Sequence, residues 1–188
     1  TESVRQRVIQ EIVNPMHHHL RNQAIPYRGV LYVGLMIDDG GAPSVIEYNV
    51  RFGDPETQVT IPLIESDLGE MLLATAEGRV ESYQPIFSDK SAITVVLASE
   101  GYPGPSKTDR EITGENTRIE EGEISAFVHQ AGTYRDEEGK LLSSGGRVLS
   151  ATALAPNLPS AVGAAYAIID EITLEGSHYR RDIAYRAL

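Results

Sequence analysis

The chain has 188 residues, a formal net charge of −11 and no cysteine. The absence of cysteine excludes disulfides, zinc–thiolate sites and thiol nucleophiles, and the negative charge disfavours binding to nucleic acid. The apolar runs are short, such as residues 30–37, and none reaches the ~20 residues of a membrane span. The sequence lacks the pattern of a signal peptide, which is a positively charged segment followed by an apolar stretch. We therefore expect a cytoplasmic protein that binds neither membrane nor nucleic acid.

The first elements expected are two helices and a hairpin. Apolar residues at helical spacing predict a helix before Asn14-Pro15, where proline is expected to interrupt it, and a second short helix over residues 16–23. Residues 29–37 are rich in Val, Leu and Tyr and predict a buried strand. The Asp-Asp-Gly-Gly turn at residues 38–41 then predicts an antiparallel pairing with a strand over residues 44–50.

Two further helices are expected before the middle of the chain. Residues 57–64 predict a short helix bent by Pro62. Asp67 and Glu70 have the spacing of a capping box, and the helix that they begin should end near Gly78. The polar stretch over residues 82–89 is the expected domain boundary, which gives domains of residues 1–81 and 82–188.

The second part of the sequence differs in style. Strands are predicted over residues 92–99, 123–129 and 141–151, with frequent glycine between them, and a helix over residues 158–172. Short strands with many turns are typical of a small antiparallel barrel or sandwich. The fold class expected for the whole chain is therefore α+β, with a small β-rich domain closed by a helix.

The strand predicted over residues 44–50 carries the best candidate site. Side chains alternate across a strand, so Glu47, Asn49 and Arg51 should share one face. The intervening apolar residues should face a core; they are Ile46, Tyr48 and Val50. A carboxylate, an amide oxygen and a guanidinium in one row suit a divalent cation that bridges to phosphate. Alternation alone is more typical of a half-exposed strand with a polar outer face than of a cation site.

The segment after this strand strengthens the functional interpretation. It contains Gly53, Asp54 and Glu56 and leads directly into the start of the predicted helix. The first backbone amides of a helix have no partner within it and attract anions. The sequence therefore places a candidate cation site, an arginine and an anion-binding turn within about a dozen residues of one another.

The run VIEYNVRFGDPETQ, residues 45–58, resembles the signature segment of the glycinamide ribonucleotide synthetases, also called phosphoribosylamine–glycine ligases. Five other stretches resemble the same family in the same order, so the resemblance covers nearly the whole chain. They are PYRGVLYVGLM (26–36), LIESDL (63–68), VVLASEGYPG (95–104), SSGGRVLSATAL (143–154) and HYRRDIAYRAL (178–188).

The resemblance implies the C-terminal part of an ATP-grasp ligase. Such an enzyme joins glycine to 5-phosphoribosylamine through glycyl phosphate at the expense of ATP. It implies that Glu47 and Asn49 bind Mg²⁺ or Mn²⁺ and that Arg51 offsets charge on the transferred phosphoryl group. Gly53, Asp54 and Glu56 are implied to contact 5-phosphoribosylamine. The family's N-terminal domain, its adenine-holding segment and its glycine-binding loop have no counterpart in these 188 residues.

Two alternatives accompany this interpretation. The chain could be a stand-alone metal- or nucleotide-responsive binding module without catalysis. The histidines at positions 17, 18 and 19 also invite a metal site, but neighbouring helical residues point about 100° apart and cannot all converge on one ion. We therefore expect these histidines to be solvated or partly packed.

Overall fold

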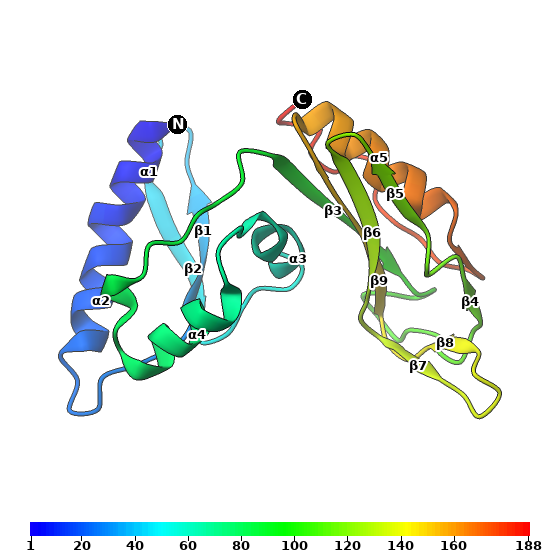
Figure 1. The fold of residues 1–188 in the computed structure, drawn as a ribbon, viewed down its shortest axis with the longest axis horizontal. Coiled ribbons are helices and arrows are strands. Elements are labelled where there is room, and N and C mark those ends of the chain that lie inside the picture. Colours follow the sequence, from blue (N-terminus) through cyan, green and yellow to red (C-terminus); the bar gives the residue numbers. More distant parts are fainter. The chain divides into compact units, whose positions relative to one another are not determined.

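The computed structural model describes residues 1–188. It consists of two compact units (Figure 1). Unit 1 comprises Thr1–Gly53 and Ser66–Pro85, and unit 2 comprises Asp54–Glu65 and Ile86–Leu188. The segment 54–65 thus belongs with the later part of the chain, and the domain boundary expected after residue 81 stays a prediction.

Unit 1 begins with a continuous helical rod. It consists of α1 (Glu2–Val8), a wider π-helical turn (Ile9–Val13) and α2 (Asn14–Arg21). The expected interruption at Asn14-Pro15 was wrong. Proline has no N–H and its ring would clash with the carbonyl four residues earlier. A wider π turn precedes this proline, in which the amide of Asn14 bonds to Ile9, five residues back, and the helical course continues past the proline ring.

The predicted hairpin is confirmed. Strand β1 (Tyr32–Ile37) pairs antiparallel with β2 (Pro43–Asn49). Gly41 has a φ of 76° in the turn, a conformation that favours glycine. The Asp38 carboxylate accepts a 2.7 Å hydrogen bond from the amide of Ala42. The turn chemistry in the sequence therefore specified the register of the two strands.

Helix α4 (Leu68–Glu77) begins and ends where the sequence predicts. The Asp67 side chain caps it by accepting a 2.9 Å hydrogen bond from the amide of Glu70. Gly78 ends it in the left-handed conformation, with φ 75°. The Glu70 carboxylate pairs with Arg79 at 2.9 Å. A short 3₁₀ turn, Val80–Ser82, completes unit 1.

Unit 2 is built on an open four-stranded antiparallel sheet. Its strands, in spatial order, are β3 (Ser91–Ala98), β9 (Arg147–Ala155), β6 (Ile124–Gln130) and β5 (Arg118–Glu121). Helix α5 (Leu158–Asp170) packs across β3, β9 and β6. Helix α3 (Thr57–Thr60), followed by a 3₁₀ turn at Ile61–Leu63, contacts β3 and β9 from the side away from α5 (Figure 1).

Two small two-stranded sheets complete unit 2. One pairs β4 (Ile112–Thr113) with β10 (Thr173–Leu174), and the other pairs β7 (Thr133–Arg135) with β8 (Leu141–Ser143).

The main core lies between this sheet and α5. Ile93, Val95 and Leu97 of β3 face the helix, together with alanines of β9 and the buried Ile168 and Ile169 of α5. In unit 1, by contrast, Ile12 and Ala74 are the buried hydrophobic residues. Because burial of apolar area is the main source of folding free energy, unit 2 carries most of the stabilising core.

The sheet is open, so the expected barrel is not found. The predicted helix is present as α5, but the strand predicted over residues 141–151 is divided into β8 and β9. Ser99 explains the division, because its amide and hydroxyl donate to the carbonyls of Gly146 and Gly145 at 2.8 and 2.9 Å. No helix is long and apolar enough to cross a membrane.

Candidate functional site

Glu47 and Asn49 lie side by side on β2, as alternation predicted. The Asn49 amide Nδ2 donates a 2.9 Å hydrogen bond to Glu47 Oε1. This bond uses the nitrogen of the amide and one oxygen of the carboxylate. Asn49 Oδ1 and Glu47 Oε2 are therefore two neighbouring oxygen donors of the kind that Mg²⁺ prefers.

The neighbouring strand makes room for this pair. Glu47 lies opposite Gly34 of β1, and a Cβ built on Gly34 would stand 3.1 Å from Glu47 Cγ. A larger residue at position 34 would push the Glu47 side chain away from the strand. The pairing register then shifts between Gly34 and Leu35, which leaves Ile46 as the extra residue of a β-bulge.

The expectation that the other side of β2 faces a core was wrong. Ile46 is 63% exposed, Val50 is 72% exposed and Tyr48 is 37% exposed. The β1–β2 sheet has only two strands, and β2 is contacted by the helical residues 2–13. Two strands and one helix do not enclose an apolar face, which is why these side chains remain accessible.

Arg51 does not continue the row of Glu47 and Asn49. Strand β2 ends at Asn49, so alternation no longer determines the direction of later side chains. The Arg51 guanidinium donates a 2.9 Å hydrogen bond from Nη1 to the carbonyl of Phe52. The structure brings Glu47 and Asn49 together and leaves Arg51 on an exposed bend beyond them.

The remaining predicted residues lie where the chain passes between the units. Gly53 is buried at the end of one segment of unit 1, and Asp54 begins unit 2. The carbonyl of Glu56 accepts a 3.0 Å bond from the amide of Thr60 and so starts α3. Helix α3 has four residues. A helix this short adds little dipole, so the anion-binding role that the sequence suggested for its start stays a prediction.

Asp54 is held by a residue that the sequence interpretation did not select. Arg147, at the start of β9, donates from Nη1 to the Asp54 carbonyl at 3.1 Å, and its Nη2 lies 3.4 Å from the Asp54 carboxylate. Gln58 also donates to that carboxylate at 3.4 Å. The only signal for Arg147 was its place in the stretch SSGGRVLSATAL, which gives no distance to Asp54.

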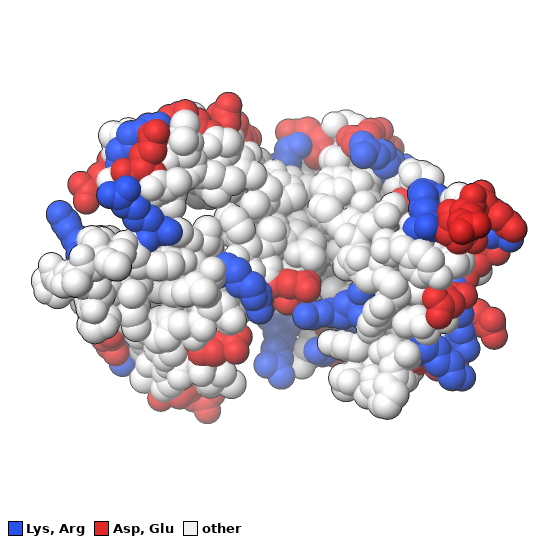
Figure 2. Space-filling model, turned by 90° about the horizontal axis from the view of Figure 1, so that it is seen from below, with Lys and Arg blue, Asp and Glu red and all other residues white.

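Other potential metal ligands do not gather elsewhere. No group of three or more His, Cys, Asp or Glu side chains is placed to hold a metal ion. His18 and His19 contact Asn22 and Gln23 through their ring nitrogens at 2.9 and 3.3 Å. On the face shown in Figure 2, acidic and basic side chains are interspersed and do not form one block of either sign.

Unit 1 also contains a cavity of about 690 Å³. Its lining is largely apolar and comes from the helical rod, the segment before β1, the start of β1 and residues 75–81. It includes Ile12, Met16, Leu20, Tyr27 and Val33. None of the six predicted site residues lines this cavity. It is therefore separate from the Glu47–Asn49 pair.

Comparison with known proteins covers both units. The model of the phosphoribosylglycinamide synthetase C domain matches residues 92–186. The model of the ATP-grasp (A) domain of the same synthetase matches residues 1–57. The six motifs of the sequence thus fall in a chain whose two ends match two domains of one enzyme family.

Curated relatives match the chain over its length. The phosphoribosylamine–glycine ligase of Chlorobaculum tepidum is 46% identical over 188 residues, which is 100% of this chain and 43% of the relative. The trifunctional purine biosynthetic protein adenosine-3 of Gallus gallus is 44% identical over 186 residues, which is 98% of this chain and 18% of the relative. The chain therefore spans less than half the length of these relatives.

Solved structures agree. The phosphoribosylamine–glycine ligase of Thermotoga maritima superposes with a TM-score of 0.74 at 35% identity, over 93% of this chain and 41% of that one. Biotin carboxylase from Campylobacter jejuni superposes with a TM-score of 0.55 at 17% identity, which is a likeness of fold alone. The resemblance found in the sequence motifs is confirmed, and the chain belongs to the phosphoribosylglycinamide synthetase family.

Proposed function

We propose that this chain is the C-terminal part of a phosphoribosylamine–glycine ligase of de novo purine biosynthesis. Unit 1 then supplies half of an ATP-grasp lobe, and the rest of the enzyme supplies the N-terminal domain and the adenine pocket. The observation that carries the proposal is the 46% identity to a ligase of that name over all 188 residues. The cytoplasm is the compartment in which we place the reaction.

The proposed reaction has two steps. A carboxylate oxygen of glycine attacks the γ-phosphorus of ATP, and the bond to the β-phosphate oxygen breaks to release ADP. The amine of 5-phosphoribosylamine then attacks the acyl carbon of glycyl phosphate. Phosphate leaves, the amine loses a proton, and glycinamide ribonucleotide remains. Positioning and electrostatic stabilisation supply most of the catalysis in phosphoryl transfers of this kind.

The donor set of β2 fits the divalent cation that ATP-grasp chemistry uses. Glu47 and Asn49 would hold Mg²⁺ or Mn²⁺, which when bound neutralises charge on the β- and γ-phosphates of ATP. Their 2.9 Å hydrogen bond fixes the amide so that its oxygen stands beside the carboxylate. Two protein oxygens are a partial set, which is typical of Mg²⁺ sites completed by water and substrate phosphates.

Arg51 and the following residues have proposed roles toward the substrates. Arg51 offsets charge on the transferred phosphoryl group through its planar guanidinium. Gly53, Asp54 and Glu56 contact 5-phosphoribosylamine. The contacts of Arg147 and Gln58 with the Asp54 carboxylate support this role, because they fix the orientation of a carboxylate on an otherwise exposed turn.

A chimera tests the proposal. The segment of the Chlorobaculum tepidum ligase that aligns with this chain is replaced by these 188 residues, and ADP release is measured with glycine, 5-phosphoribosylamine and ATP. We expect turnover that requires all three substrates and a divalent cation. The same assay on the ligase with the segment deleted, and on the 188-residue chain alone, should show none.

Two results would contradict the proposal. A soluble, folded chimera without glycine-dependent ADP release would show that this chain cannot serve as the ligase segment. Micromolar ATP binding by the 188-residue chain alone would instead favour a self-sufficient nucleotide-binding module.

A further inference from the structure

The four-stranded sheet of unit 2 has one apolar face and one face of mixed side chains, which is called the polar face because it carries hydroxyls and an imidazole. The apolar face packs on α5. By the strand register, the opposite face carries Thr94 of β3, Ser150 and Thr152 of β9, and Phe127 and His129 of β6, together with the apolar Val96 and Leu154. Thr152 is fully buried and Ser150 is 4% exposed, so hydroxyl groups are enclosed beside this face. Burying a hydroxyl costs free energy unless it is hydrogen-bonded, so the partners of these groups show what the face is arranged to do.

A chain of hydrogen bonds fixes one side of the His129 ring. Thr94 Oγ1 lies 2.8 Å from Thr152 Oγ1, and Thr152 Oγ1 lies 3.0 Å from His129 Nδ1. Each hydroxyl has a single proton, so the chain runs in one direction at a time. If Thr94 donates to Thr152 and Thr152 donates to Nδ1, the neutral ring carries its proton on Nε2.

The reverse direction is less favourable. Nδ1 would then donate to Thr152, and the chain would have to end on the carbonyl of Ala151, which lies 3.4 Å from Thr94 Oγ1. That separation is long for an O–H···O hydrogen bond. The geometry therefore favours His129 as a donor through Nε2. The edge-to-face contact with Phe127, with ring centroids 5.0 Å apart, restricts the ring further.

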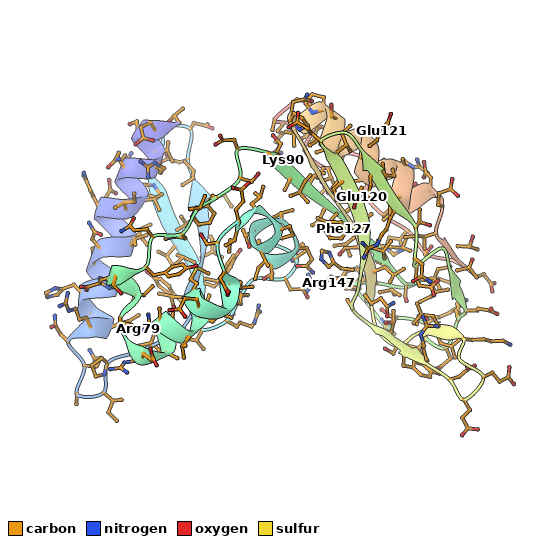
Figure 3. All side chains as sticks on the ribbon, in the orientation of Figure 1. Arg79, Lys90, Glu120, Glu121, Phe127 and Arg147 are labelled. Carbon is orange, nitrogen blue, oxygen red and sulfur yellow. The ribbon has the colours of Figure 1, made fainter.

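Arg118 on β5 supplies a positive charge beside this imidazole. It lies directly opposite Phe127 in the β5–β6 register, which makes His129 its diagonal neighbour on the same face. Arg118 is exposed, and its side chain makes no hydrogen bond or ion pair. Of the other charged groups on this face, Glu120 accepts a bond from Ser125 at 3.0 Å, and Arg147 pairs with Asp54. Figure 3 shows Phe127 and Arg147 on the same side of the sheet.

We infer that this polar face binds a phosphate group, with Arg118 as its charged partner and His129 Nε2 as an oriented hydrogen-bond donor. A guanidinium matches the geometry of phosphate oxygens, and a neutral donor beside it adds direction without a second charge. Burial lowers the pKa of His129, which is consistent with a ring that is neutral in the free protein. Helix α3, TQVT, brings no charged side chain to the face. The inference rests on the proposed function for the source of the phosphate, a sugar phosphate.

Nuclear magnetic resonance of the 188-residue chain tests the inference. The chain has five histidines, and the His129 ring signals are identified by their loss in His129→Phe. Ribose 5-phosphate, inorganic phosphate and ATP are titrated separately. We expect ribose 5-phosphate to shift the His129 signals saturably and to raise its pKa, because a bound dianion stabilises the charged ring.

Matched variants connect the response to the named residues. Arg118→Gln should weaken the apparent affinity about tenfold or more, the scale of one charge-assisted hydrogen bond. Arg135→Gln removes a similarly exposed arginine that already pairs with Glu115 at 3.2 Å, and should change nothing. Thr152→Val should alter the tautomer of His129 and weaken binding, while Thr152→Ser should restore both; thermal melts of each variant verify folding.

The outcomes separate this inference from the proposed function. Saturation by ribose 5-phosphate or by ATP, lost in Arg118→Gln, supports the phosphate site and identifies its source. No shift with any of the three compounds, or shifts that Arg118→Gln leaves unchanged, would overturn it. The titration measures binding, and the chimera assay measures turnover, so the two proposals can fail separately. If the chimera is active but the His129 signals do not respond to any of the three compounds, only the phosphate site is contradicted. If the chimera is inactive but the His129 signals respond, only the ligase assignment is contradicted.

Discussion

Arg147 ties β9 to the turn that contains Asp54, although the two residues are 93 positions apart in the sequence. The guanidinium makes one contact with the Asp54 backbone carbonyl and one with its carboxylate. The first contact needs no acid at position 54, whereas the second does. The pair therefore positions the turn through two separable interactions.

This geometry predicts unequal effects of removing each partner. Arg147→Gln loses both contacts, and Asp54→Asn loses the ion pair alone. An exposed ion pair contributes at most about 1 kcal/mol, and a hydrogen bond to a carbonyl about 0.5–1.5 kcal/mol. In urea unfolding of the 188-residue chain, Arg147→Gln should destabilise unit 2 by more than Asp54→Asn. Arg118→Gln is the control, since Arg118 has no partner to lose. Equal losses from the two variants would show that the carbonyl contact contributes nothing.

A second prediction concerns where the core lies. Ile93 is 4% exposed on β3, and Ile46 is 63% exposed on β2. Ile93→Ala leaves a cavity between sheet and helix and should cost about 2–5 kcal/mol. Ile46→Ala removes a side chain that is mostly in water and should stay within about 0.5 kcal/mol. Thermal melts of the two variants decide the matter. A large loss from Ile46→Ala would mean that β2 is covered in solution.

Local signals predicted much of this fold. The Gly41 turn, the Asp67 cap and the Gly78 end of α4 all depend on chemistry within a few residues. Strand β5 was missed because RIEE is short and charged, as edge strands often are, and only its pairing with β6 makes it a strand. The course of the helical rod past Pro15 was missed because a π turn leaves no sequence pattern of its own.

In the candidate site, too, the features that depend on neighbouring residues were predicted and those that depend on distant residues were not. Glu47 and Asn49 were predicted to be neighbours because alternation is a local property of a strand, and their hydrogen bond confirms it. Arg51 was extrapolated beyond the end of β2, where that rule stops. The partner of Asp54 and the hydroxyl chain of His129 depend on tertiary pairing between distant strands. No spacing rule in one sequence reports such pairings.

A third prediction is a pH dependence of stability. Burial lowers the pKa of His129 below the ~6.5 of an unfolded chain. Between the two values the unfolded state binds more protons, so stability rises with pH in that window. The contribution of His129 to the free energy of unfolding should therefore fall as the pH drops through about 6.5 and be level above that pH. His129→Gln should lack this contribution. Because the cause is burial, added salt should leave the difference between the two proteins unchanged. Melting profiles from about pH 8 to about pH 5 measure it; identical profiles would contradict the assignment.

The last prediction concerns the metal ligands and uses the chimeric ligase. Glu47→Ala and Asn49→Ala should each lower kcat by about 100-fold or more, the scale on which loss of one electrostatic contact to a reacting group is felt. Excess Mg²⁺ or Mn²⁺ should rescue Asn49→Ala better than Glu47→Ala, because the carboxylate contributes charge as well as an oxygen. The loss of the amide also frees Glu47 Oε1 from its 2.9 Å hydrogen bond, so the remaining carboxylate can bind the cation with both oxygens.

Tyr48→Phe is the matched control for the two alanine variants. Tyr48 lies between Glu47 and Asn49 on the opposite face of the strand, so this variant should keep wild-type turnover. A metal titration of steady-state rates distinguishes these cases. Wild-type turnover in both alanine variants, with Tyr48→Phe equally active, would remove the metal assignment from β2.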